Sequence, residues 1–329
     1  MSGVRLQTVA RDEDGMRLDK WFGTHFPQLS FGALQKFIRT GQVRVDGGRV
    51  KTNARLAAGQ AVRVPPIEAV VAKAEVKTNA ADAEYLRGLI LYEDEDIYVF
   101  NKPSGLASQG GSGTPRHMDG LLKSLANKKG EAPKLVHRLD RDTSGCLVVA
   151  KSRAVAAHFG EVFKSRAARK IYWAIVAGNP NPKQGRISCF LVKQPTPDGG
   201  DEQMVVVPDG TEGAVHSVTY YSTTDTASRK FAWVTLKPMT GRTHQLRVHM
   251  AQLGTPILGD PRYFKLDNWI EPEGLAKGLH LHARRISLPL RSGKILDVSA
   301  PLPPNMSKTF KELGFDPDRY DVQDQDPEE

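Results

Sequence analysis

Cysteine is scarce in this sequence, with only Cys146 and Cys189 among 329 residues. Two thiols are too few for a disulfide framework or for a zinc site with four thiolates, so both are excluded. Apolar residues flank both cysteines, and we therefore expect the two thiols to pack in a core.

Long apolar segments are also absent, because no run of ~18 apolar residues occurs. The opening MSGVRLQTVARDEDG carries acidic residues and no apolar stretch of signal-peptide length. The sequence thus predicts a cytoplasmic protein with no membrane partner.

The composition, 40% hydrophobic and 25% charged, is typical of a folded globular chain. Its length exceeds one typical domain of roughly 100–200 residues, so we expect a small and a large domain. The 46 Lys and Arg residues exceed the 37 Asp and Glu residues, giving a net charge of +9. This excess favours a polyanionic partner without identifying it.

Residues 1–66 have the pattern of a small basic domain with two helices and a hairpin. Leu18, Trp21, Phe22 and Phe26 share one side of the first helix, which Pro27 ends. The second helix is expected to begin at the N-cap Ser30, to bury Leu34, Phe37 and Ile38, and to end at Gly41. The hairpin is predicted to pair residues 43–45 with 49–50 around the turn at 46–48.

Basic residues gather in the second half of this small domain. Between positions 36 and 63, one acidic residue, Asp46, is outnumbered by Lys36, Arg39, Arg44, Arg49, Lys51, Arg55 and Arg63. Such a run can be a solvated face, but the opposite faces of the helix and strands are apolar, so the charges should share one surface. We interpret this surface as a nucleic-acid interface, with Lys36, Arg39 and Arg44 as its candidate residues.

The rest of the chain divides into a linker at 67–88, a large domain at 89–311 and an acidic tail at 312–329 that we expect to be disordered. The large domain alternates strand and helix patterns, which predicts an α+β body. The predicted strands are Ile97–Phe100, Leu147–Ala150, Ile171–Val176 and Phe231–Leu236, the predicted helices are Met118–Ala126 and Ala154–Phe163, and Gln194–Gly213 is predicted to be a loop or insertion.

The densest group of reactive side chains is 136–145, VHRLDRDTSG, which leads into an apolar strand. A loop that precedes a buried strand can present charged groups from a rigid base. Under the alternative interpretation the segment is only a turn, and Arg138 pairs with Asp140 at the surface.

A second polar segment, 240–254, reads as a helix. Thr243 can cap it, Leu246, Met250 and Leu253 form its apolar stripe, and Arg247 lies beside that stripe near the start, where it could reach a carboxylate from another segment. His244 and His249 are five positions apart and do not share a face as a metal-binding pair would, so we predict no metal site.

A third candidate is the strand RKIYWAIV at 169–176, where alternation places Lys170, Tyr172 and Ala174 on one side. A strand tyrosine is by default half-buried packing. The alternatives are a stacking platform for a base or a proton acceptor.

These segments resemble the motifs of the RluA-type pseudouridine synthases. The matching residues are His137-Arg138-Leu139-Asp140 with Thr143-Ser144-Gly145, then Lys170-Ile171-Tyr172, then Gly241-Arg242-Thr243-His244-Gln245-Leu246-Arg247-Val248-His249 followed by Gly254, Ile257, Gly259 and Asp260. The N-terminal residues Arg17-Leu18-Asp19-Lys20 and Ser30 through Gly41 are similar to the RNA-binding domain first named for a small-subunit ribosomal protein. Asn101-Lys102-Pro103-Ser104-Gly105 with Gly110-Gly111-Ser112-Gly113 looks most like the RluC branch, which modifies 23S ribosomal RNA.

The resemblance implies a mixed, mainly antiparallel sheet and the isomerisation of uridine to pseudouridine in ribosomal RNA, a reaction that needs no cofactor. A monomer is the default expectation, because the sequence does not indicate the oligomeric state. It makes Asp140 the nucleophile, Arg247 its ion-pair partner and Tyr172 the ring against the target uracil. Arg138 would fill the space left by the flipped nucleotide, and His137 and Arg242 would contact the RNA. The competing hypothesis is a non-catalytic RNA-binding or ribosome-assembly factor with the same fold.

Chemically, a uridine must leave the RNA stack before its glycosidic bond can be reached, which costs a few kcal/mol that stacking can offset. The carboxylate could attack the sugar, attack the ring, or help a 2′ proton leave, and the sequence does not choose among these routes.

Overall fold

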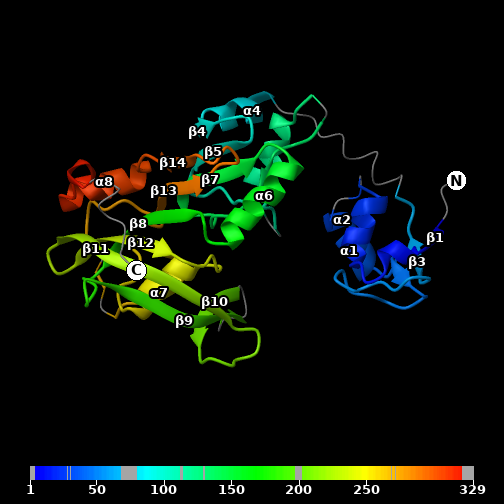
Figure 1. The fold of residues 1–329 in the computed structure, drawn as a ribbon. Coiled ribbons are helices and arrows are strands. Elements are labelled where there is room, and N and C mark those ends of the chain that lie inside the picture. The colour runs from blue at the N-terminus through cyan, green and yellow to red at the C-terminus, as the bar shows by residue number, and fades with distance from the viewer. Residues whose placement is uncertain are drawn as a thin grey trace. The chain divides into compact units, whose positions relative to one another are not determined.

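A computed structural model describes residues 4–27, 29, 31–67, 80–111, 114–128, 130–196, 202–267, 269–270 and 272–320. The chain forms two compact units, 1–77 and 78–329, which are described separately (Figure 1). In the described residues no helix has both the length and the apolar character needed to cross a membrane.

In its described residues the smaller unit has two α-helices, a short 3-10 helix and a three-stranded sheet. Its elements are β1 (Arg5–Thr8), η1 (Arg11–Glu13), α1 (Leu18–His25), α2 (Phe31–Arg39), β2 (Arg44–Val45) and β3 (Ala61–Val64). Both predicted helices are present, and Leu18, Trp21, Phe22, Leu34 and Phe37 lie in one buried cluster. The predicted N-cap Ser30 lies outside the described residues.

The hairpin predicted for this unit is wrong. Val45 closes a tight turn on Gly48, but its strand partner is Val62 of β3, and β3 also pairs with β1 in the order β1-β3-β2. The alternating residues were read correctly as a strand. Their partner lies farther along the chain, which local turn chemistry does not reveal.

The larger unit is built on one long sheet with helices around it. Its elements are α4 (Ala80–Arg87), β4 (Ile90–Glu93), β5 (Ile97–Lys102), α5 (Met118–Leu121), η2 (Leu122–Leu125), β6 (Lys134–Leu135), β7 (Ser144–Ala150), α6 (Arg153–Lys164), β8 (Arg169–Ala177), β9 (Gln184–Pro195), β10 (Glu202–Val207), β11 (Val215–Ala227), β12 (Phe231–Pro238), α7 (Gln245–Gln252), β13 (Leu281–Pro289), β14 (Ile295–Ser299), α8 (Pro304–Leu313) and η3 (Pro317–Arg319). All the strands and helices predicted for this unit are present.

The main strand order is β10-β9-β11-β12-β8-β13-β7-β5-β4, with β14 on β13 and β6 on β7. Among the strand pairs that the structure describes in this unit, β13 and β7 alone run parallel, so the predicted mixed, mainly antiparallel α+β architecture is confirmed. The three motif segments meet at the middle of this order, because β8, β13 and β7 are neighbours and α7 follows β12.

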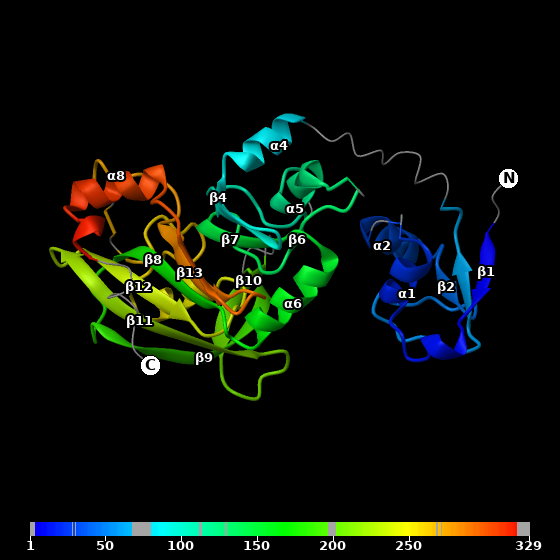
Figure 2. The ribbon, with the colours of Figure 1, turned by 45° about the horizontal axis from the view of Figure 1, so that its top comes forward.

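Strand β8 shows how the sheet divides its two faces. Ile171, Trp173 and Ile175 pack with Phe310 of α8, and Figures 1 and 2 show this helix, in red, beside the strand. Ala174 and Val176 instead pack with α7, and Tyr172 lies against the same cluster. The predicted alternation therefore places Tyr172 on the α7 face.

Three predicted boundaries need correction. The linker predicted at 67–88 ends too late, because α4 occupies 80–87 and buries Leu86, while 68–79 lie outside the described residues. The tail predicted from 312 begins too early, since Phe315 packs with Trp233, whereas 321–329 are not described. The loop predicted at Gln194–Gly213 contains the end of β9 and all of β10, which pair as an antiparallel hairpin.

Candidate active site

A cavity of about 650 Å³ opens on the α7 face of the larger unit. It is lined by the loop before β7, the end of α6, the start of β8, and the connection from β12 into α7. The structure brings six predicted site residues to this one cavity: His137, Arg138, Asp140, Tyr172, Arg242 and Arg247.

The loop that carries Asp140 is attached to its surroundings through its backbone. The Ser108 hydroxyl donates a 2.6 Å hydrogen bond to the carbonyl of Leu139. The oxygen of this hydroxyl in turn accepts a 3.0 Å hydrogen bond from the Leu139 N–H. The Ser104 hydroxyl donates to the carbonyl of Asp142 at 2.9 Å. These contacts, with buried Leu139, fix the loop from beneath while the Asp140 carboxyl lines the cavity.

Lys102 adds a buried cation beneath the same loop. Its side chain is fully buried, and Nζ donates to the carbonyls of Pro103 (2.9 Å), Leu106 (2.7 Å) and Arg141 (3.0 Å). Burial lowers the pKa of Lys102 to about 7, although the charges of Asp142 and Asp140 raise it. The sequence analysis used this lysine only to choose a branch of the family. A lysine inside a strand pattern, next to a proline, was the available indication of its role.

His137 performs a packing role at the edge of the cavity. Its Nε2 accepts a 2.9 Å hydrogen bond from the Val148 N–H, and its ring stacks on Phe163 at 4.5 Å. Burial and the charge of Lys170 lower the pKa of His137 to about 3. The imidazole is therefore neutral and offers no positive charge to RNA, whereas Arg138 and Arg242 are exposed at the cavity.

Tyr172 lies half-buried on β8 and lines the same cavity as Asp140. Burial, the negative charge of Asp140, and Cys146 all raise the pKa of Tyr172 above its ordinary value near 10. The phenol therefore stays protonated near neutral pH, which favours contact through its ring over a role as an ionised base.

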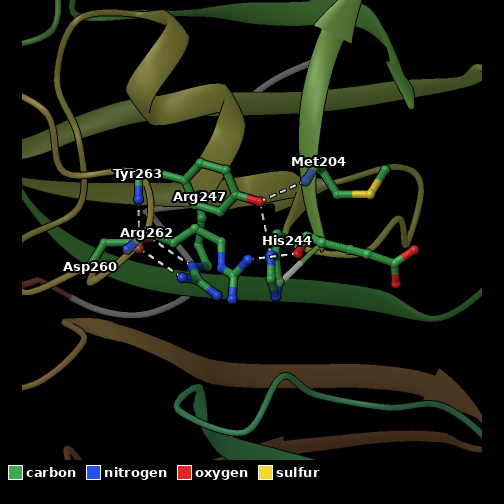
Figure 3. A network of polar contacts seen from close by, with 7 residues as sticks. Met204, His244, Arg247, Asp260, Arg262 and Tyr263 are labelled. Atoms are coloured by element: carbon green, nitrogen blue, oxygen red, sulfur yellow. Dashed lines mark hydrogen bonds and ion pairs between the residues drawn. The ribbon is translucent and has the colours of Figure 1, made fainter. Parts of the chain in front are cut away.

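Arg247 forms its ion pair with Asp260 and not with Asp140, which corrects the expected pairing. Its Nε and Nη2 each donate a 2.7 Å hydrogen bond to the Asp260 carboxylate, and both side chains are almost fully buried (Figure 3). Burial alone lowers the pKa of Arg247, but the hydrogen bonds and charge of Asp260, with the charge of Asp140, raise it. The guanidinium is thus fixed as a cation near Asp140.

Asp260 was noted in the sequence only as a continuation of a motif. Its Oδ1 also accepts the backbone N–H groups of Arg262 (2.9 Å) and Tyr263 (3.0 Å). Despite burial, these bonds and Arg247 lower the pKa of Asp260. Gly259, the residue before Asp260, allows the backbone to pass close to Gly278. Its φ is +70°, and a Cβ there would lie 2.0 Å from the Gly278 carbonyl oxygen.

Tyr263 links this pair to β10. The Arg247 guanidinium lies over the Tyr263 ring at 5.1 Å, and the Tyr263 hydroxyl accepts a 3.0 Å hydrogen bond from the Met204 N–H. The same hydroxyl lies 2.9 Å from Nδ1 of His244 (Figure 3). The hairpin that was predicted to be a loop therefore contacts the residues that position Arg247.

The start of α7 differs from its predicted cap. His244 occupies the N-cap position in a left-handed conformation (φ 52°), and no side chain caps the helix there. Gln245 instead ties the preceding connection to the helix, because its Oε1 accepts from Thr240 Oγ1 (2.7 Å) and from the Arg242 N–H (3.1 Å). Thr243 lines the cavity instead.

The cavity is strongly cationic. Among its described lining residues one carboxylate, Asp140, faces six cationic side chains: Arg138, Lys164, Arg166, Lys170, Arg242 and Arg247. Such a lining favours a polyanionic ligand and surrounds a single carboxyl group, that of Asp140.

The three candidates in the smaller unit lie on α2 and β2. Lys36 and Arg39 are exposed on α2. Arg44 donates to the carbonyls of Gly41 and Gly47, so it also braces the turn beside β2. Among the residues that the structure describes, no three His, Cys, Asp or Glu side chains are grouped as metal ligands would be.

Comparisons with known proteins agree with this geometry. Residues 96–252 match the family model described as RNA pseudouridylate synthase. The sequence is 34% identical over 322 residues to the ribosomal large subunit pseudouridine synthase C of Pasteurella multocida (strain Pm70), with 94% of each chain covered. It is 32% identical over 321 residues to the protein of the same name from Escherichia coli (strain K12), covering 94% of this chain and 97% of that one.

A solved structure titled human RNA pseudouridylate synthase domain containing 4 matches with a TM-score of 0.60 and 31% identity, over 70% of this chain and 95% of that chain. The three motif segments, which carry Asp140, Tyr172 and Arg247, all lie around one cavity in this fold. The chain therefore belongs to the RNA pseudouridylate synthase family, of the RluA type, and is an RNA pseudouridine synthase.

Proposed function

We propose that this enzyme isomerises selected uridines of large-subunit ribosomal RNA, with Asp140 as the catalytic carboxylate. The observation that carries the proposal is the placement of Asp140, Tyr172 and Arg247 around one cationic cavity. The choice of RNA is supported by the names of the relatives from Pasteurella multocida and Escherichia coli, which are large-subunit enzymes. Ribosomal RNA as substrate also implies that the enzyme acts in the cytoplasm.

In the proposed reaction the bond between ribose C1′ and uracil N1 breaks, the freed uracil turns, and C1′ joins C5. One proton leaves C5 and one is gained at N1, so no atom is added or lost overall. Asp140 supplies the negative charge that either bonds to the reacting centre or assists loss of a 2′ proton. Arg247, held by Asp260, places a positive charge beside that carboxylate in the cavity.

The neighbouring side chains have positioning roles in this proposal. The Tyr172 ring lies against the uracil, and Arg138, exposed at the cavity, fills the space that the flipped nucleotide vacates. Arg242 contacts the RNA from the start of α7, and His137 contributes through the loop that it packs. Lys36, Arg39 and Arg44 of the smaller unit bind phosphates, which fixes the RNA without reading its bases.

The test is pseudouridine mapping of 23S ribosomal RNA from cells that lack this protein, complemented with wild type, Asp140→Asn or Asp142→Asn. Asparagine preserves the size of each side chain and removes its charge. The Asp142 carboxylate forms an exposed pair with Arg141, worth under ~1 kcal/mol, so its variant is a matched control.

We expect discrete pseudouridines to vanish from the deletion strain and to return with wild type and Asp142→Asn alone. Full restoration by Asp140→Asn would show that the catalytic assignment is wrong. An unchanged map in the deletion strain would reject 23S ribosomal RNA as the substrate and favour a binding or assembly factor.

A further inference from the structure

A second, smaller cavity of about 310 Å³ adjoins the catalytic one. The two cavities share Arg166, Lys170, Pro238 and Met239. Four of the seven described residues that line the smaller cavity are cationic and none is acidic, the four being Arg166, Arg169, Lys170 and Lys237. They come from the α6–β8 connection, the start of β8 and the end of β12.

Arg166 occupies a backbone position that normally favours glycine. It follows α6 with φ of 65°, and the next residue, Ala167, donates its N–H to the Val162 carbonyl at 3.1 Å. This is the pattern in which a helix ends with a left-handed residue, usually Gly. An arginine there costs roughly 1–2 kcal/mol relative to its relaxed conformation. The end of the helix would thus be more stable with glycine.

Lys170 is the most enclosed cation of the group. Its side chain is half-buried, and burial together with the charge of Arg166 lowers the pKa of Lys170. Two like charges repel each other, and their partial burial removes solvating water. An anion bound between them would offset both the repulsion and the cost of desolvation. A solvated surface lysine would carry neither penalty.

The position of the smaller cavity relative to Tyr172 indicates which anion would bind there. Lys170 and Tyr172 lie on the same face of β8, about 7 Å apart along the strand. A nucleotide whose base lies against the Tyr172 ring must have its sugar and phosphates nearby. The smaller cavity is within the reach of such a phosphate.

We propose that Arg166 and Lys170, with Arg169 and Lys237, bind a backbone phosphate of the RNA strand beside the nucleotide that enters the catalytic cavity. This inference rests on the proposed function, because it assumes that RNA is the ligand. The phosphate contact holds the displaced strand while the base turns, and it carries no base specificity.

The test compares Arg166→Gly with Arg166→Lys for binding to a short oligouridylate across a series of salt concentrations. Glycine removes the charge and relieves the backbone strain, so the variant is expected to fold with an equal or higher Tm. Lysine keeps both the charge and the strain. Lys294→Ala is the matched control, since Lys294 is an exposed cation in the β13–β14 turn that lines neither cavity.

We expect Arg166→Gly to weaken oligouridylate binding about tenfold, as for the loss of one charge-assisted contact. It should also reduce the slope of log K against log salt by about 0.7. Arg166→Lys and Lys294→Ala should bind nearly as wild type does. If Arg166→Gly binds with the affinity and slope of wild type, the cations are a solvated face and the proposal is overturned.

Uridine monophosphate, titrated in parallel, separates a backbone phosphate from that of a free nucleotide. Loss of mononucleotide binding in Arg166→Gly, with oligouridylate binding unchanged, would also overturn the proposal. All of these measurements need no catalysis. A protein that shows this binding pattern but modifies no 23S ribosomal RNA would contradict the proposed function and leave the phosphate site supported.

Discussion

The Asp260 carboxylate accepts four hydrogen bonds in the structure, two from Arg247 and two from backbone N–H groups. Neither side chain of the Arg247–Asp260 pair reaches more than 6% exposure. A buried pair of this kind adds little net stability while it is intact, but the loss of one partner leaves an uncompensated charge. Asp260 therefore acts as a positioning residue for Arg247.

Asp260→Asn is predicted to destabilise the enzyme by about 3 kcal/mol, because the Arg247 guanidinium remains buried without a counter-charge. The free energy of unfolding in urea measures this. In the folded fraction, kcat should fall while KM for RNA changes little, since Arg247 acts on Asp140 and not on the backbone of the RNA.

The control for this substitution is Asp82→Asn, which breaks an exposed pair with Arg116 and should cost under ~1 kcal/mol. If both variants lost the same small amount of stability and kept full kcat, the positioning role of Asp260 would be refuted.

At the scale of elements, the start of β7 depends on Gly145. Its φ is +107°, and a Cβ there would lie 2.2 Å from the carbonyl oxygen of Ala283, its partner on the parallel strand β13. A side chain would push apart the two strands that lie directly beneath the Asp140 loop.

Gly145→Ala is therefore expected to cost at least about 3 kcal/mol, from overpacking together with backbone strain. Gly160→Ala is the matched control, because Gly160 lies inside α6 and an added Cβ would meet no atom within 4 Å apart from its chain neighbours and the backbone of its own helix. That change should stabilise the protein by about 0.5–1 kcal/mol. Thermal unfolding of the two variants measures both changes. Equal shifts of Tm in the same direction would contradict the role given to Gly145.

Helices and strands with a strong apolar period were predicted well from the sequence. The strands with which they pair were predicted poorly. Tyr172 was placed on the correct face because β8 alternates between two packed faces. The hairpin of β9 and β10 was missed because the apolar run at 204–207 is short and lies between two segments rich in Pro, Gly and Asp, so the whole stretch was read as a loop.

The site itself was predicted in part. Asp140, Tyr172 and Arg247 were found from their motifs and meet at one cavity. The carboxylate that pairs with Arg247 was assigned wrongly, because Asp260 reaches it from a loop beyond α7 and only tertiary structure decides between two carboxylates. The role of Lys102 was missed for the same reason, since its three carbonyl partners come from two separate loops.

At the scale of the whole molecule, several histidines are buried in the neutral form. Burial lowers the pKa of His249 and of His282 to about 4. The unfolded chain, with an ordinary histidine pKa near 6.5, binds more protons than the folded chain between pH 6.5 and about 4. The stability that these neutral histidines contribute is therefore fully present above this pH window and is lost as the pH falls through it.

The free energy of unfolding should fall by about 1.4 kcal/mol per pH unit for each such histidine within the window. Urea unfolding at pH 7 and pH 5 measures this. His249→Gln, which cannot take up a proton, should show a shallower dependence than wild type. Identical urea midpoints at the two pH values would contradict the neutral, buried state of these rings.

The two units are expected to divide binding from chemistry. Replacing Lys36 and Arg39 together by Gln should raise KM for ribosomal RNA and leave kcat nearly unchanged, since both side chains are exposed on α2 of the smaller unit. Steady-state kinetics on a 23S transcript tests this, with Lys294→Ala as the control for the loss of an exposed cation elsewhere. A fall in kcat alone would argue against a role confined to holding the RNA.

The loop that presents Asp140 is held through its backbone carbonyl groups, which every type of residue has. Ser108, Ser104 and Lys102 bind the carbonyls of Leu139, Asp142 and Arg141, and none of these contacts involves the side chains of Arg141 or Asp142. The exposed side chains of the loop can therefore vary from one relative to another while Asp140 keeps its place. A single scaffold can in this way acquire new RNA targets without rebuilding its chemistry.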